Sequence, residues 1–133
     1  MAFGTDEQTP LTDAIVTLLA DRGHEVDVVA LGDPWPDAGR LVGEAVGTGS
    51  CDAGVVCCWT GTGVSIAANK VSGVRAALCT DAATASGARR WNDANVLALG
   101  LRLTSDAVAT EILDAFLSTE VEASERSTIA KLP

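Results

Sequence analysis

A cysteine pair followed by a glycine-rich turn is the part of this sequence best suited to chemistry. Residues 54–70 read GVVCCWTGTGVSIAANK, in which an apolar run ends at Cys57 and Cys58 and leads into Thr60-Gly61-Thr62-Gly63. A strand that passes through a glycine loop into a helix presents backbone N–H groups and the positive end of the helix dipole to an anion. The segment therefore predicts an enzyme that stabilises a developing oxyanion beside a thiol.

The segments that must position this loop alternate between strand-like and helical patterns. Short apolar runs predict strands at residues 1–5, 25–31, 53–58, 74–79 and 95–99. Amphipathic segments predict helices at residues 9–22, 37–48, 62–71, 81–90 and 105–118, and Gly32 to Pro36 predicts a loop. Such alternation is typical of a parallel sheet covered by helices on both faces. We therefore expect one α/β domain over residues 1–133, with its ligand beyond the carboxyl ends of the strands.

Composition and charge restrict the possible functions. The chain has 133 residues, of which 47% are hydrophobic, so it can bury a core as one domain. Nine Lys and Arg stand against 18 Asp and Glu, and the net charge of −9 argues against nucleic-acid binding. No apolar run is long enough to cross a membrane, and the first residues carry no signal-peptide pattern. We expect a cytoplasmic protein with no nucleic-acid or membrane partner.

The four cysteines do not have the spacing of a metal site. Cys51, Cys57, Cys58 and Cys79 form no CxxC pair, and the only histidine, His24, is far from them in the sequence. We expect reduced thiols, with Cys51, Cys57 and Cys79 as small core residues. Because side chains alternate along a strand, only one of Cys57 and Cys58 can reach the loop. His24 is expected in a surface turn between a helix and a strand.

Three blocks of sequence carry a family resemblance. They are Cys58-x-Thr60-Gly61-x-Gly63-x-Ser65-Ile66-Ala67-Ala68-Asn69-Lys70, Gly73-x-Arg75-Ala76-Ala77 and Asn92-Asp93-Ala94-Asn95-Val96-Leu97. With these blocks the chain resembles the ribose-5-phosphate isomerase B and galactose-6-phosphate isomerase family. The resemblance implies a Rossmann-like three-layer α/β/α sandwich with a five-stranded parallel sheet. It also implies a homodimer or tetramer with active sites at the subunit interface and no metal or organic cofactor.

The resemblance further implies an activity and roles for individual residues. The family interconverts an aldose and a ketose through a cis-enediolate, and Cys58 corresponds to its catalytic base. The Thr60 hydroxyl and the N–H groups of the Gly61-Thr62-Gly63 turn would hold the enediolate oxygens. Asp6 corresponds to an aspartate that binds substrate hydroxyls. Asn92 corresponds to an asparagine that would hold a substrate oxygen, in the neighbouring subunit's site.

Several positions depart from the family pattern. Glu7 and Trp91 stand where the family commonly has histidines, and the second of these is associated with opening the sugar ring. Indole can donate a hydrogen bond but cannot act as a base. Trp59 replaces a glycine, and Trp35 is near the position of a family tyrosine. All three tryptophans of the chain are therefore expected at the site, where they would make the pocket smaller and more apolar.

Anion recognition also differs from the family pattern. The polar tail at residues 119–133, expected to pack on a partner subunit, carries one arginine, Arg126, where the family has several basic residues. We expect Arg102 to bind a phosphate or a carboxylate, and Arg126 is either a second anion ligand or a solvated tail residue. Three further arginines are expected on solvated faces: Arg75, Arg89 and Arg90.

Three functional hypotheses follow. The first is an isomerase of a small or acyclic sugar phosphate or sugar acid rather than ribose 5-phosphate, because an open-chain substrate needs no ring-opening histidine. The second is an epimerase, which would share the proton abstraction and return the proton to a different atom. The third is a catalytically impaired binding or regulatory subunit of a hetero-oligomer. The retained Cys58, Thr60 and glycine turn argue against the third.

Overall fold

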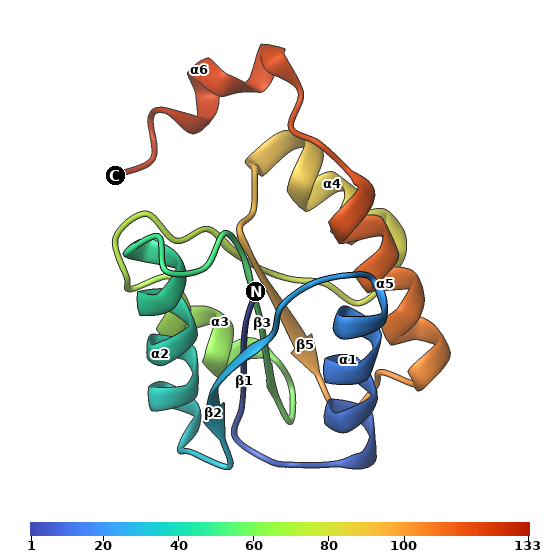
Figure 1. Cartoon of the computed structure of the whole chain (residues 1–133). Coiled ribbons are helices and arrows are strands. Elements are labelled where there is room, and N and C mark those ends of the chain that lie inside the picture. The colour runs from blue at the N-terminus through green and yellow to red at the C-terminus, as the bar shows by residue number, and fades with distance from the viewer.

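Five short strands form one parallel sheet in the computed structural model, which describes residues 1–133 (Figure 1). The sheet order is β2-β1-β3-β5-β4. The strands are β1 (Ala2–Thr5), β2 (Asp27–Leu31), β3 (Gly54–Cys58), β4 (Ala76–Leu78) and β5 (Val96–Gly100). The central strand β3 is buried at every position, since its apolar residues meet helices on both faces of the sheet. The predicted α/β fold with a five-stranded parallel sheet is confirmed.

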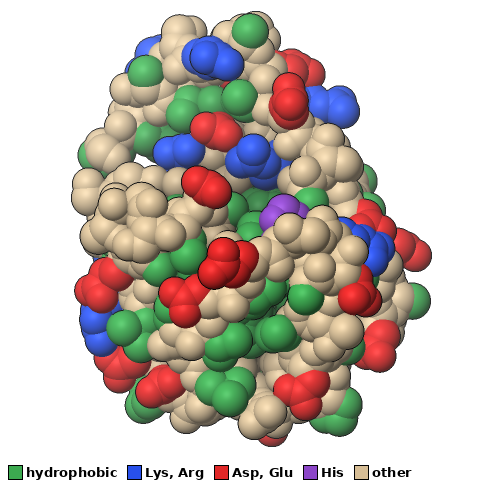
Figure 2. All heavy atoms as spheres, viewed as in Figure 1, with side chains coloured by type: hydrophobic (Ala, Val, Ile, Leu, Met, Phe, Trp, Pro, Cys, Tyr) green, Lys and Arg blue, Asp and Glu red, His purple; other side chains and the backbone are tan.

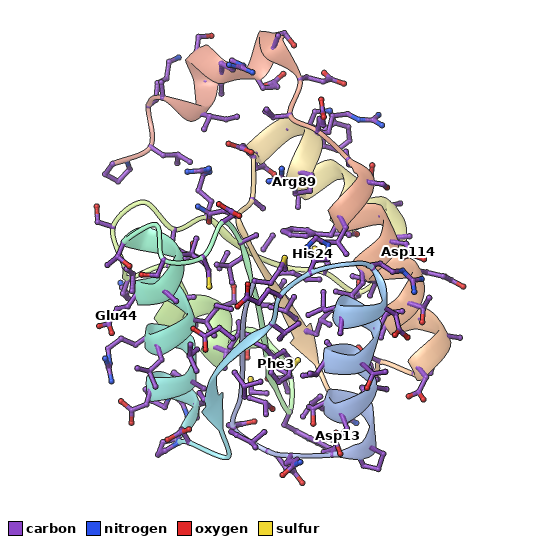
Figure 3. The ribbon with its side chains drawn as sticks, in the orientation of Figure 1. Phe3, Asp13, His24, Glu44, Arg89 and Asp114 are labelled. Atoms are coloured by element: carbon purple, nitrogen blue, oxygen red, sulfur yellow. The ribbon has the colours of Figure 1, made fainter.

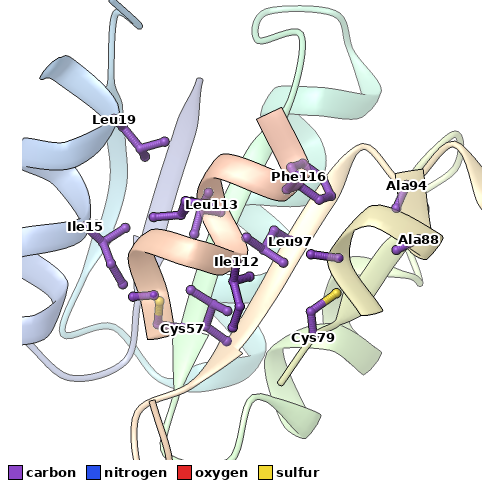
Figure 4. Packing of buried hydrophobic residues seen from close by; sticks show 14 of the residues in the cluster. Ile15, Leu19, Cys57, Cys79, Ala88, Ala94, Leu97, Ile112, Leu113 and Phe116 are labelled. Atoms are coloured by element: carbon purple, nitrogen blue, oxygen red, sulfur yellow. The ribbon is translucent and has the colours of Figure 1, made fainter. Parts of the chain in front are cut away.

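Two layers of helices cover the sheet. The first face packs against α1 (Pro10–Asp21), α4 (Ala82–Asn92) and α5 (Asp106–Ser118), and the second against α2 (Trp35–Gly47) and α3 (Thr62–Ala68). Figure 4 shows the core of the first face, where side chains of the three helices meet those of β3 and β5. No helix of the chain has the length and apolar character needed to cross a membrane.

The helix starts follow local sequence signals, with one exception. The Thr9 hydroxyl accepts a hydrogen bond from the Thr12 N–H at 3.2 Å, and the Thr12 hydroxyl accepts one from the Thr9 N–H at 2.8 Å, so α1 begins at a capping box. The predicted loop at residues 32–36 is wrong at its end, because α2 begins at Trp35. Proline is compatible with the first turn of a helix, which needs no N–H donor there, so Pro36 does not delay the start.

Glycines on α2 let α3 approach it closely. Gly39, Gly43 and Gly47 recur every four residues and face α3 and the segment that follows it. A Cβ atom added at Gly39 would lie 2.6 Å from the Ala67 Cβ and 2.7 Å from the Val64 carbonyl oxygen. The close approach fixes the position of α3 and therefore of the glycine turn at its start.

Leucine at position 39 is expected to separate α2 from α3. Overpacking of this kind costs about 1–3 kcal/mol of unfolding free energy, and no rotamer of leucine avoids the Val64 carbonyl. Urea unfolding of Gly39→Leu checks this. The control is Glu44→Leu on the exposed side of the same helix, where only a surface ion pair with Arg40 is lost. Equal stability of the two variants would contradict the proposed packing.

The C-terminal tail lies beyond the amino ends of the strands. It contains a 3₁₀ turn, η1 (Ala123–Glu125), and a short helix, α6 (Arg126–Ile129), which stands away from the two helical layers (Figure 1). A hollow of about 840 Å³ lies beneath it, between residues 129–133 and residues 69–77 (Figure 2). Packing of this tail on a partner subunit remains a prediction.

Candidate functional site

The carboxyl edge of the sheet brings together most of the predicted site residues. Asp6 follows β1, Cys58 ends β3 and Arg102 follows β5. Thr5 pairs with Cys57 and Cys58 pairs with Gly100, so the three strands end at the same level. Residues from distant parts of the chain therefore meet at one edge, as expected for ligand sites on open parallel sheets.

The two adjacent thiols face opposite sides of the sheet. Cys57 is 0% exposed and points into the first core, near Ile15 and Ile112 (Figure 4), and this burial raises the pKa of its thiol far above the usual range. Cys58 is 5% exposed and lies on the other face, with Val64 of α3 in the same cluster. The alternation predicted from the sequence is confirmed, and Cys58 is the thiol on the side of α3.

Asp6 places an unsatisfied acceptor at the same edge of the sheet as this thiol. Its backbone N–H donates to the Cys57 carbonyl at 3.3 Å, which sets Asp6 alongside Cys58 on the neighbouring strand. The carboxylate atom Oδ1 is buried and has no hydrogen-bond partner within the chain. Burial raises the pKa of Asp6, and the negative charge of Glu7 adds to this shift. A buried acceptor without a partner is costly, and a bound hydroxyl would satisfy it.

Glu7 itself is exposed in the turn after β1. The Thr5 hydroxyl donates to the Glu7 carbonyl oxygen at 2.7 Å, which fixes the turn.

Asparagine at position 6 is expected to stabilise the fold and impair the site. A carboxyl with a raised folded-state pKa stabilises the protein below its unfolded pKa, and this stability is lost as the pH rises through the folded value. Asp6→Asn should therefore melt above the wild type at pH 7, and the difference should close near pH 3.5. Loss of a charged acceptor is expected to lower kcat/KM by about 10- to 100-fold.

Thermal unfolding at both pH values, with turnover at pH 7, checks these two effects. Asp52→Asn, on the exposed surface at the other end of the sheet, is the control and should show neither. A melting temperature of Asp6→Asn below the wild type at pH 7 would contradict the account of the buried carboxylate.

The glycine turn after β3 is fixed by its packing against β5. Gly61 has φ +76°, and a Cβ there would lie 2.5 Å from the Leu78 Cδ1 and 2.9 Å from the Gly100 nitrogen. A Cβ at Gly100 would in turn lie 2.8 Å from the Thr60 carbonyl oxygen. The hydroxyls of Thr60 and Thr62 are 2.8 Å apart and both residues are exposed. The first N–H groups of α3 have no acceptors within the helix, so this turn can donate to an oxyanion beside Cys58.

Two of the three tryptophans lie at this edge. A Cβ added at Gly63 would be 2.9 Å from the Trp35 ring, so the indole covers the turn. The Arg102 N–H donates to the Trp59 carbonyl at 2.9 Å, and both residues line a hollow of about 90 Å³. Further lining residues carry no signal in the sequence beyond their place on or after strands that end at this edge: Leu78, Thr80, Leu103 and Thr104.

Arg102 and Arg126 differ from the other arginines in having no carboxylate partner. Five of the seven arginines form ion pairs: Arg22, Arg40, Arg75, Arg89 and Arg90. The expectation that Arg75 and Arg89 lie on solvated faces is wrong. Both are partly buried and bind Asp93, at the end of α4. Arg102 is exposed beside Trp59, so its guanidinium is free to bind an anion.

Three predicted site residues lie at the opposite edge of the sheet. Trp91 and Asn92 end α4, and Arg126 begins α6, all near the amino ends of the strands (Figure 1). A five-residue strand such as β5 spans about 17 Å, so these side chains do not meet Cys58 of the same chain. Their place in the site remains a prediction that needs a second copy of the chain. His24 lies in a surface turn, as predicted (Figure 2).

Comparisons with known proteins identify the family of the chain. The model of the Ribose/Galactose Isomerase family matches residues 1–132. Ribose-5-phosphate isomerase B of Escherichia coli K12 is 39% identical over 129 residues, which are 92% of this chain and 85% of that protein. D-erythrulose-4-phosphate isomerase of Pectobacterium atrosepticum is 35% identical over 128 residues, which are 92% of this chain and 84% of that protein.

A solved structure agrees with the same assignment. Ribose-5-phosphate isomerase B of Clostridium thermocellum superposes with a TM-score of 0.89 at 39% identity, over 99% of this chain and 95% of that one. Fold, sequence and the order of the matching blocks lead to the same family. The chain therefore belongs to the ribose/galactose isomerase family of sugar-phosphate isomerases.

Proposed function

We propose that the protein isomerises a small or acyclic sugar phosphate or sugar acid, rather than ribose 5-phosphate, through a cis-enediolate. The observation that carries this proposal is the arrangement at the carboxyl edge, where Cys58 lies beside the glycine turn and Asp6. Cys57 and Cys79 face the first core, and Cys51 lies before the amino end of β3, so we assign Cys58 as the base.

The proposed reaction moves one proton between adjacent carbons. The Cys58 thiolate takes the proton from the carbon next to the carbonyl, and the electron pair of that C–H bond forms the enediolate. The Thr60 hydroxyl and the N–H groups of Gly61 and Gly63 donate to the enediolate oxygen as charge develops. The Cys58 thiol then protonates the other carbon, with the substrate's own proton or with one exchanged from solvent, while Asp6 accepts a hydrogen bond from a substrate hydroxyl.

Two observations favour a short, open-chain substrate. Trp91 stands at the position of the family's ring-opening histidine and cannot act as a base, and Trp59 brings an exposed indole to the carboxyl edge beside Arg102, which leaves less room there. The relative from Pectobacterium atrosepticum is named for D-erythrulose 4-phosphate, a four-carbon ketose phosphate that cannot close an ordinary furanose ring. Arg102 would bind the phosphate or carboxylate of such a substrate.

A complete site on this proposal requires a second copy of the chain. Asn92 and Arg126 are exposed at the amino edge, and the tail around Leu132 extends from the body with an exposed apolar side chain. A homodimer or a tetramer would bring this edge to the carboxyl edge of a partner. All four cysteines are free thiols, which suits the reducing cytoplasm where we place the enzyme.

Turnover of a substrate panel tests the proposal. We expect kcat/KM for D-erythrulose 4-phosphate to exceed that for ribose 5-phosphate by about 100-fold, since the missing ring-opening acid–base group contributes on this scale. A preference for ribose 5-phosphate would contradict the proposed substrate class. No turnover of ketose phosphates, aldose phosphates or acyclic uronates would instead favour the impaired-subunit hypothesis.

A further inference from the structure

The turn between α4 and β5 contains the one strained backbone position in the chain. Asp93 has φ 46°, and it is the only residue other than glycine with a positive φ. A non-glycine residue in this region carries a conformational cost and persists where its surroundings hold it. Glycine makes such helix ends without that cost. The Asp93 side chain therefore has a role that glycine could not fill.

Two arginines from different elements bind the Asp93 carboxylate. The Arg75 Nη2 donates to Oδ2 at 3.0 Å, and its Nε donates to the Asp93 carbonyl oxygen at 2.7 Å. The Arg89 Nη1 donates to Oδ1 at 3.1 Å and also to the Ala94 carbonyl oxygen. Both arginine side chains are about three quarters buried, at 27% and 24% exposure, so the two ion pairs are partly shielded from solvent. Figure 3 shows Arg89 on α4, close to where the chain leaves α5 for the tail.

The same network continues into the segments on either side. Asn95 accepts a hydrogen bond from the Arg75 N–H at 2.8 Å and donates to the Gly73 carbonyl at 2.9 Å, so the entries to β4 and β5 are joined. The Arg89 Nε donates to the Thr119 carbonyl at 3.3 Å, at the start of the tail.

Asn92 stands directly before the residue that this network holds. It is exposed, and its side-chain amide takes part in none of these hydrogen bonds. The network therefore fixes the backbone at Asp93, while Asn92 lines the hollow beneath the tail and its amide has no hydrogen-bond partner within the chain. A single hydrogen-bonding side chain that acts across a subunit interface needs a rigid backbone beneath it. A displacement of that side chain by about 1 Å can lower the rate of the reaction 100-fold.

We infer that Asp93 is a positioning residue that aims Asn92 at the substrate in a second copy's active site. The inference rests on the proposed function and on the two-copy site that it requires. Arg75 binds Asp93 from the segment before β4 and Arg89 binds it from α4, so the backbone beside Asn92 is tied to one strand and one helix.

Asp93→Gly separates this role from a merely structural one. Glycine adopts the required φ freely, and both guanidiniums keep backbone carbonyl acceptors, so the melting temperature should fall by no more than about 5 °C. We expect kcat to fall about 30-fold with KM changed less than about threefold. Asp93→Asn tolerates the same backbone and keeps one acceptor oxygen, so it should recover most of the lost kcat.

Asp114→Asn is the matched control. Asp114, on α5 (Figure 3), also joins distant parts of the chain, through bonds to the Arg22 guanidinium at 2.8 and 2.9 Å, but it makes no bond to the turn after α4. Hydrogen–deuterium exchange of residues 91–95 supplies a readout that does not depend on turnover. The exchange rate of residues 91–95 should rise in Asp93→Gly and stay unchanged in Asp114→Asn.

Mixed oligomers test whether Asn92 acts on the other copy. Co-refolding Asp93→Gly with Cys58→Ala should restore one site, built from Cys58 of the first chain and Asn92 of the second, and about a quarter of the wild-type activity. Unchanged exchange at residues 91–95, unchanged kcat, or no recovery in the mixture would each overturn the inference. If the wild type shows no turnover, the proposed function fails, and the exchange measurement still decides whether Asp93 holds this segment.

Discussion

Alanine in place of Cys58 is expected to lower kcat by about 1,000-fold, the scale on which a positioned general base contributes. The same change at Cys57 should leave kcat within about threefold of the wild type, because that thiol points into the first core and its pKa is raised by burial. Removing the Cys57 sulfur leaves a small cavity and should lower the free energy of unfolding by about 1–2 kcal/mol. Steady-state kinetics on the two variants, with urea unfolding, measure both effects.

The two cysteines form a matched pair because they are neighbours in the chain and differ in the face they occupy. Cys58→Ser adds a further control, since a hydroxyl keeps the shape of the site but is a far weaker acid than a thiol. Loss of turnover in Cys57→Ala together with full turnover in Cys58→Ala would contradict the assignment of the base.

Arg102→Gln is expected to raise KM for an anionic substrate by about 10- to 100-fold with little change in kcat. The guanidinium has no carboxylate partner in the chain and lies beside Trp59 and Thr60, so its whole charge is available to the substrate. Kinetics on the acyclic substrate and on its uncharged parent sugar measure the effect. The loss should appear with the charged substrate alone.

Arg22→Gln is the control for this prediction. Arg22 is bound to Asp114 at the far end of α1, and its loss should leave KM unchanged. An equal loss for charged and uncharged substrates in Arg102→Gln would show that Arg102 supports the turn rather than binding an anion.

The sequence predicts the fold well because each signal is local. Each of these signals lies within a few neighbouring residues: the five apolar runs, the alternation at Cys57 and Cys58, and the helix start at Thr9-Pro10. The sequence does not predict the start of α2, because proline is as compatible with a first helical turn as with a loop, and the packing of Trp35 on Gly63 is not visible in the sequence.

The roles of the arginines could not be predicted in the same way. Arg75 binds Asp93, 18 residues away, and an ion pair at that separation leaves no periodic signal in the sequence. Contacts between residues far apart in the sequence also limit the prediction of the site. Asp6, Cys58 and Arg102 meet because parallel strands end at one edge, which a fold prediction supplies. Asn92 and Arg126 belong to the other edge, and their part in the site depends on an assembly that one chain does not contain.

Incorporation of solvent deuterium tests the central claim most directly. The protein is incubated in D₂O with D-erythrulose 4-phosphate, and the carbon that bears the transferred hydrogen is followed by NMR. We expect deuterium at that carbon with the wild type and with Cys57→Ala, to the extent that the Cys58 thiol exchanges its proton with D₂O before it protonates the product, and none above background with Cys58→Ala. Incorporation by Cys58→Ala equal to that of the wild type, or full turnover by that variant, would contradict proton transfer by the Cys58 thiol.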